Sequence, residues 1–124
     1  MDIEEEVYTV RLMGDGVQDQ EGTFTLFERG ERCLLVLKLN DQYLEAEEAD
    51  YFEALCRIRE KLVPFGLQPY CYGASRNVFP SGMARDMGSG IRAYKLTIGQ
   101  SARLEDLVNI FESGDDVEVV TVAK

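Results

Sequence analysis

The chain has 124 residues, 45% hydrophobic and 29% charged, a composition typical of a single globular domain over residues 1–124. Thirteen Lys and Arg residues are outnumbered by twenty-three Asp and Glu residues, so the formal net charge is −10, and the sequence contains no histidine. This charge disfavours nucleic-acid binding, and the missing imidazole excludes Ser-His-Asp or Cys-His catalysis and His-ligated zinc or haem.

The three cysteines, Cys33, Cys56 and Cys71, lie far apart in apolar runs, and their odd number argues against a complete disulfide framework. A reducing compartment is the simpler explanation, so we expect a cytoplasmic protein. No apolar run approaches the roughly 18 residues that span a bilayer, and the acidic start of the chain is unlike a secretory signal. We expect no membrane partner, no cofactor and, because the carboxylates lack a calcium-loop spacing, no bound metal.

Three strands are predicted in the first third of the chain. Residues 7–13 alternate apolar and polar side chains, as in a half-buried strand, and the glycines at 14–16 end it. Residues 23–28 are rich in β-branched and aromatic types. Residues 33–39 are apolar on both faces, which predicts a strand in the interior of a sheet.

From Glu45 the apolar spacing changes to that of an amphipathic helix. Acidic residues cluster at its start and basic residues near its end, which complements the helix dipole. Pro64 and Gly66 then stop it. The apolar stripe of this helix consists of Phe52, Leu55, Cys56, Arg59, Leu62 and Val63.

The remaining chain predicts strands over 67–72, 91–98 and 117–122. Between the last two, residues 101–114 repeat the helical stripe, with Ser101 as its N-cap. From residue 31 onward the order is strand, helix, strand, strand, helix, strand. We therefore expect an α+β fold: a ferredoxin-like βαββαβ core with an extra amino-terminal β-hairpin, one mostly antiparallel sheet and two helices on one face.

A long basic loop joins two of these strands. Residues 71–95 carry four basic residues and one acidic residue in an otherwise acidic chain. Its glycines could let backbone amides approach an anion that the serines and arginines hold, or the arginines could pair with the protein's own carboxylates. The binding candidates in this loop are Tyr72, Gly73, Ser75, Arg76, Asn77, Ser81, Arg85 and Asp86.

A second candidate site is an acidic face that would steer a basic partner into contact, although solubility alone could explain the same charges. Its candidate residues are Glu45, Glu47, Glu48, Asp115 and Asp116.

Other side chains carry weaker functional hypotheses. Cys71 has tyrosines on both sides and basic residues after it, but a strand-centre cysteine without histidine is more often a small core residue. An enzymatic hypothesis with Asp86 as base and Arg85 as anion clamp is the least favoured, because that pair is common. Tyr70 and Tyr94, with Tyr72, could line a pocket or pack in the core.

The carboxy-terminal half resembles a known group of sequences. The strings CYGASRNVFPSGMARDMGSG (71–90), AYKL (93–96) and DLVNIF (106–111) are similar to small uncharacterised bacterial proteins, some of which look like immunity proteins of toxin systems. The resemblance implies a bacterial cytoplasmic protein and a toxin antagonist as its function, and it names no site residue.

Together these observations favour a protein that is not an enzyme. We expect a protein-interaction module, an immunity-type inhibitor of a basic bacterial toxin such as a nuclease. The alternative is a module that binds a small anion with the loop at 73–90. An exposed amino-terminal edge strand would also permit a homodimer.

Overall fold

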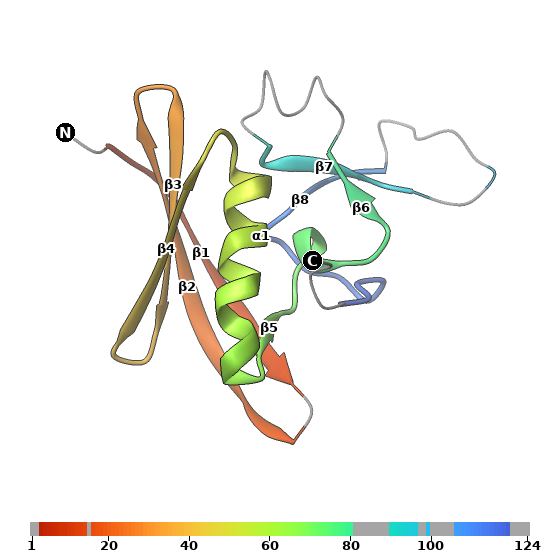
Figure 1. The fold of residues 1–124 in the computed structure, drawn as a ribbon. Coiled ribbons are helices and arrows are strands. Elements are labelled where there is room, and N and C mark those ends of the chain that lie inside the picture. Colours follow the sequence, from red (N-terminus) through yellow and green to blue (C-terminus); the bar gives the residue numbers. More distant parts are fainter. Residues whose placement is uncertain (1–2, 15, 81–89, 97–98, 100–105, 120–124) are drawn as a thin grey trace.

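The computed structural model of the protein describes residues 3–14, 16–80, 90–96, 99 and 106–119 (Figure 1). Four long antiparallel strands follow one another as a meander: β1 (Ile3–Gly14), β2 (Val17–Arg29), β3 (Arg32–Leu39) and β4 (Gln42–Glu48). A short strand, β5 (Gln68–Pro69), pairs with the other side of β1, so the sheet order is β4-β3-β2-β1-β5.

Alternation along the strands gives the sheet one apolar face. Val10 and Leu12 of β1, Phe24 and Leu26 of β2 and Leu35 of β3 are all buried. The sheet curls, and α1 (Tyr51–Leu62) lies along this inner face (Figure 1). The polar residues between these positions face outward, so sheet and helix share one core.

Local sequence fixes both ends of α1. The carboxylate of Asp50 accepts a hydrogen bond from the backbone N–H of Glu53 at 2.7 Å, which is an N-cap. After Leu62 the chain makes one 3₁₀ turn, η1 (Val63–Phe65), and Gly66 follows with a φ of +72°. This left-handed conformation favours glycine and ends the helical segment.

A second, smaller sheet lies on the other side of α1 (Figure 1). It is formed by β6 (Val78–Phe79), β7 (Arg92–Lys95) and β8 (Leu107–Asn109). The 3₁₀ turn η2 (Tyr72–Ala74) leads into it. A Cβ on Gly73 would come within 2.9 Å of the Cβ of Ile110 and closer still to Leu55, so glycine lets η2 lie tightly between the helix and β8.

The expected ferredoxin-like βαββαβ fold is wrong. The structure is mostly β, with a curled five-stranded antiparallel sheet, a small second sheet and, in its described part, one α-helix. Two elements cause the difference. Residues 42–48 form β4 where the acidic residues predicted the start of the helix, and residues 107–109 form β8 inside the predicted second helix.

Several local predictions are nevertheless confirmed. The strands expected at 7–13, 23–28 and 33–39 are present, the first two pair as an antiparallel hairpin, and the first helix ends before Pro64. The strand expected at 67–72 is reduced to two residues, and Val119 makes only an isolated bridge with Ser75.

Other expectations fall outside the described residues, among them the capping role of Ser101. Within the described residues, no helix has both the length and the apolar character needed to cross a bilayer.

Candidate functional site

A cavity of about 590 Å³ opens along the edge of β1. Its walls are residues 8–11 of β1, Glu21 of β2, Tyr70 directly after β5, and residues 111–113, which begin two positions after β8 ends. Because these segments come from both sheets, the cavity lies where the carboxy-terminal part of the chain returns to the amino-terminal strand.

Aromatic rings form one wall of the cavity. The rings of Tyr8 and Phe111 stack with centroids 5.1 Å apart and planes at 21°, and Phe111 also contacts Phe24 at 5.2 Å. Phe111 is buried, whereas Tyr8 is half-buried. The stack therefore presents a partly exposed aromatic surface supported by the core.

The hydroxyl of Tyr8 takes part in two hydrogen bonds. It donates to the carboxylate of Glu6 and accepts from the side-chain amide of Asn109 at 2.9 Å. Burial, followed by the hydrogen bond to Glu6, raises the pKa of Tyr8 above its usual value. The hydroxyl therefore stays protonated near neutral pH and holds β1 against β8.

The edge of β1 beside this cavity has few backbone partners. The carbonyl of Arg11 accepts a hydrogen bond from the N–H of Tyr70 at 2.8 Å, so Arg11 points its backbone groups away from β2. Alternate residues of a strand point the same way, so Thr9 and Val7 direct their backbone groups to the same edge. Within the described residues no strand pairs with them there, since β5 covers only Leu12 and Met13.

Charged side chains line the outer part of the cavity. Glu21, Glu112 and Arg11 are all exposed. None of the three makes an ion pair with a described residue. The lining therefore has one more carboxylate than guanidinium groups.

The structure uses the backbone amides of the predicted anion loop for folding. The N–H groups of Tyr72 and Gly73 donate to the carbonyls of residues 112 and 110, and that of Arg76 donates to the carbonyl of residue 118. The amides of Ala74 and Ser75 close the η2 turn. These five amides are not available to an anion.

Some side chains of this loop also make hydrogen bonds within the protein. The hydroxyl of Ser75 donates to Asn77 and accepts from the N–H of Glu118, both at 2.9 Å. Arg76 is exposed. The candidates Ser81, Arg85 and Asp86 lie outside the described residues, so the anion hypothesis stays a prediction for them.

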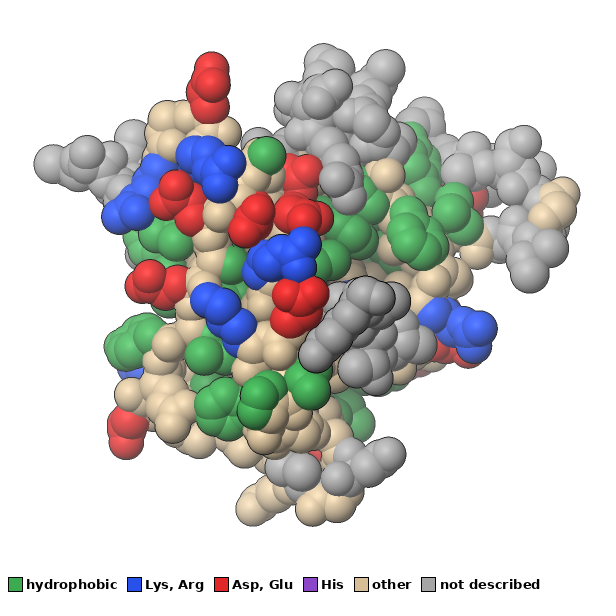
Figure 2. All heavy atoms as spheres, in the orientation of Figure 1, with side chains coloured by type: hydrophobic (Ala, Val, Ile, Leu, Met, Phe, Trp, Pro, Cys, Tyr) green, Lys and Arg blue, Asp and Glu red, His purple; other side chains and the backbone are tan. Residues whose placement is uncertain are grey.

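The predicted acidic face is divided between two places. Glu45, Glu47 and Glu48 lie on β4, whereas Asp115 and Asp116 follow β8 on the other side of α1 (Figure 1). Acidic and basic side chains alternate over β4 and α1 (Figure 2). They do not form one continuous acidic surface there.

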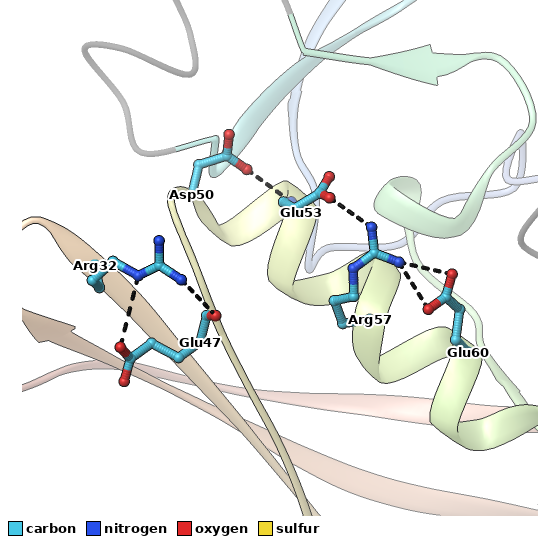
Figure 3. Close-up of polar contacts among 6 residues, drawn as sticks. All are labelled: Arg32, Glu47, Asp50, Glu53, Arg57 and Glu60. Atoms are coloured by element: carbon cyan, nitrogen blue, oxygen red, sulfur yellow. Dashed lines mark hydrogen bonds and ion pairs between the residues drawn. The ribbon is translucent and has the colours of Figure 1, made fainter.

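Ion pairs use many of the charges near β4 and α1. Glu47 pairs with Arg29 at 3.1 Å and with Arg32 at 3.7 Å. On α1, Arg57 pairs with Glu53 at 2.7 Å and with Glu60 at 2.8 Å (Figure 3). The hydrogen bonds to these two carboxylates, that to Glu60 first, raise the pKa of Arg57. These exposed pairs organise the surface more than they stabilise it.

Asp116 forms a second polar cluster. Its carboxylate accepts hydrogen bonds from the hydroxyl of Tyr72 at 2.8 Å and from Lys95 at 3.0 Å, and these bonds lower its pKa. The same bonds raise the pKa of Tyr72 and of Lys95. Of the predicted site residues, Tyr72 and Asp116 are therefore brought together, although they were assigned to different sites.

Cys71 lies in the core. It is fully buried, and the loss of solvent raises the pKa of its thiol to about 12. A thiol with this pKa is not a nucleophile near neutral pH. The described residues also contain no cluster of three or more potential metal ligands.

Comparison with protein-family models and with curated proteins finds no match to this chain. The sequence reasoning identified Tyr70 as a residue that could line a pocket, and the structure places it in the cavity wall. It missed Tyr8, Arg11 and Phe111, because their association depends on contacts between opposite ends of the chain. The only available signal was the alternation that put Tyr8 on the same face as Val10.

Proposed function

We propose that this chain is a non-enzymatic interaction module that binds a basic partner protein. The observation that supports it is a surplus of exposed carboxylates. Lys95 and the arginines at 29, 32 and 57 are already in ion pairs with carboxylates of the chain. Exposed carboxylates that make no ion pair with a described residue are Glu6, Asp19, Glu21, Glu28, Glu31, Asp41, Glu45, Glu112, Asp115 and Glu118. They outnumber the exposed basic residues without such an ion pair, which are Arg11, Lys38, Lys61, Arg76 and Arg92.

Such a surface favours fast, salt-dependent association with a basic protein, because unpaired carboxylates attract a positive surface over several ångströms. A bacterial toxin that acts on nucleic acid carries a basic surface of this kind. The proposed role is therefore that of an immunity protein that neutralises such a toxin, in agreement with the sequence resemblance. The proposed location is the cytoplasm.

Affinity capture of the tagged full chain from a lysate of its own organism tests this function. The proteins retained at about 0.1 M salt, where the Debye length is about 10 Å, should include a basic one that is released at 1 M salt. Co-expression should then suppress the toxicity of that partner. A partner retained equally at both salt concentrations would contradict an electrostatic interface.

Matched charge variants examine the acidic candidates on β4. Glu45→Gln with Glu48→Gln removes two carboxylates from this strand without breaking a described ion pair. Asp19→Asn with Glu118→Gln makes the same change in net charge elsewhere. A larger loss of binding in the first variant would place the basic partner at β4, whereas undiminished binding in both would exclude the acidic candidates on β4 as the docking face.

A further inference from the structure

We infer that the free edge of β1 binds an extended, basic segment of another protein, which adds to the five-stranded sheet as a further strand. The basic character of that segment rests on the proposed function, whereas the edge is an independent observation. The segment would continue the line of β5, which leaves β1 directly after Tyr70.

The backbone of β1 is arranged to accept a strand. Its pairing with β2 keeps one register from Glu6 to Leu12, and the irregularities lie outside this stretch. The outward backbone groups of Val7 and Thr9 are two residues apart, about 6.6 Å at 3.3 Å per residue, which is the spacing that a neighbouring strand requires. An added strand would give these groups hydrogen-bond partners inside the complex.

The cavity provides the space for that strand. Neighbouring strands lie about 4.8 Å apart, so an added strand would run directly along the backbone of residues 8–11. The cavity of about 590 Å³ borders these residues and is also lined by residues 111–113. Side chains on one face of the added strand would contact the Tyr8–Phe111 stack.

The chemistry of the walls selects basic side chains. Glu21 lies opposite Arg11 on the outer face of the sheet, so it would pair with Lys or Arg on that face of the added strand. The Tyr8–Phe111 stack lies on the inner face and would contact apolar side chains on the other face of that strand. The two carboxylates, Glu21 and Glu112, outnumber the single guanidinium of Arg11, so an acidic segment would meet a lining of net negative charge. The partner segment is therefore extended and carries Lys or Arg at alternate positions.

The opposite edge of the sheet, formed by β4, differs from the β1 edge because charged side chains cover part of its backbone. On β4, the backbone carbonyls of Glu45 and Glu47 accept hydrogen bonds from the side chains of Lys61 and Arg32. Charged side chains that cover an edge strand oppose the addition of another strand. Among the described residues, charged side chains cover outward carbonyls on β4 but not those of Val7 and Thr9 on β1.

Hydrogen exchange measured by NMR on the full chain tests the inference with a capped peptide of alternating Lys and Val, seven residues long. Binding should slow exchange of the Val7 and Thr9 amides and leave that of Tyr43, on β4, unchanged. Thr9→Pro removes only an outward donor and should weaken binding about fivefold or more, the effect of one backbone hydrogen bond. Tyr43→Pro is the matched control at the opposite edge.

A peptide with N-methyl groups on alternate residues tests the same bonds without altering the protein. One peptide is methylated on the Lys residues and the other on the Val residues, and only one of the two sets of amides faces β1. One peptide should therefore lose binding and the other keep it. This comparison tests strand addition even if the Thr9→Pro variant does not fold. The inference is wrong if exchange at Val7 and Thr9 is unchanged. Slower exchange that depends on protein concentration alone would assign the edge to a second copy of the chain and overturn the inference.

Three further outcomes test the charge preference and separate this inference from the proposed function. An acidic peptide of alternating Glu and Val that binds as well as the basic one would overturn the charge preference. A captured basic partner whose binding is unaffected by Thr9→Pro would overturn the edge site while leaving the proposed function in place. If the basic peptide binds this edge but no basic partner is captured, the proposed function fails and the edge site stands.

Discussion

Asn109 donates a hydrogen bond from its side-chain amide to the hydroxyl of Tyr8 over 2.9 Å, and so ties β8 to β1. The Asn109 side chain also accepts from the backbone N–H of Phe111 at 2.8 Å, which fixes the turn that brings the Phe111 ring onto Tyr8. One side chain thus shapes the turn and joins the two sheets. The cavity wall at residues 111–113 depends on this link.

Phe111→Ala should lower the free energy of unfolding by about 3 kcal/mol, because it removes a buried ring that contacts Tyr8 and Phe24. Urea denaturation followed by circular dichroism measures this change. Phe79→Ala is the control, since the Phe79 side chain is 51% exposed and its loss should change stability by no more than about 0.5 kcal/mol. Equal effects of the two substitutions would show that Phe111 is not part of the core.

Asp50→Ala should lower the free energy of unfolding by about 1 kcal/mol or more, because it removes the N-cap of α1. Asp50→Asn keeps an oxygen that can accept from the Glu53 N–H and should recover most of this loss. Urea denaturation of the two variants gives the comparison. A variant with Ala as stable as the one with Asn would rule out the capping role.

Burial of Cys71 makes the free energy of unfolding depend on pH in the alkaline range. The ordinary pKa of 9.0 is raised to about 12 in the folded state, so above pH 9 the unfolded chain loses a proton that the folded chain keeps. The contribution of the protonated Cys71 thiol to the free energy of unfolding is fully present below pH 9. It falls by up to about 1.4 kcal/mol per pH unit as the pH rises toward 12.

Urea denaturation at pH 8 and pH 10 measures the effect, with Cys71→Ala as the comparison. The variant is less stable at pH 8 because it loses buried volume, but its stability should fall less between the two pH values. In the native protein at pH 8, Cys71 should also resist alkylation. An equally steep pH dependence in the variant would assign the effect to other groups.

Lys61→Ala combined with Arg32→Ala should increase self-association, because it uncovers the carbonyls of Glu45 and Glu47 on β4. Sedimentation velocity over a range of protein concentrations detects this change. The control is Lys38→Ala with Arg76→Ala, which removes the same charge from exposed positions without uncovering the edge of β4. This variant should have the same sedimentation coefficient as the unmodified protein. Association in both variants would point to net charge as the cause.

The sequence predicted the first three strands correctly because their signals are local. Residues 7–13 show the two-residue alternation of a half-buried strand, and residues 33–39 are apolar on both faces, as in the interior of a sheet. β4 was missed because an edge strand needs few apolar residues. Only Leu44 and Ala46 mark its inner face, and the glutamates around them resemble the acidic first turn of a helix.

The predicted second helix failed for a related reason. Leu107, Val108 and Phe111 fit a helical stripe, but short apolar runs fit a strand equally well, and pairing with β7 decides between them. Of the residues that line the cavity, only Tyr70 was predicted from the sequence to line a pocket. Its other walls meet through the association of the two sheets, which no local pattern in a single sequence encodes.

The order of the strands has a kinetic consequence. β2, β3, β4 and α1 each contact the element before them, and turns of two residues join the strands, so this half of the molecule closes short loops only. The contacts of β5 and Asn109 with β1 close much longer loops, which is slower. During refolding the curled sheet with its helix should form first. The cavity wall at residues 111–113 should be the last part of the molecule to become protected from hydrogen exchange.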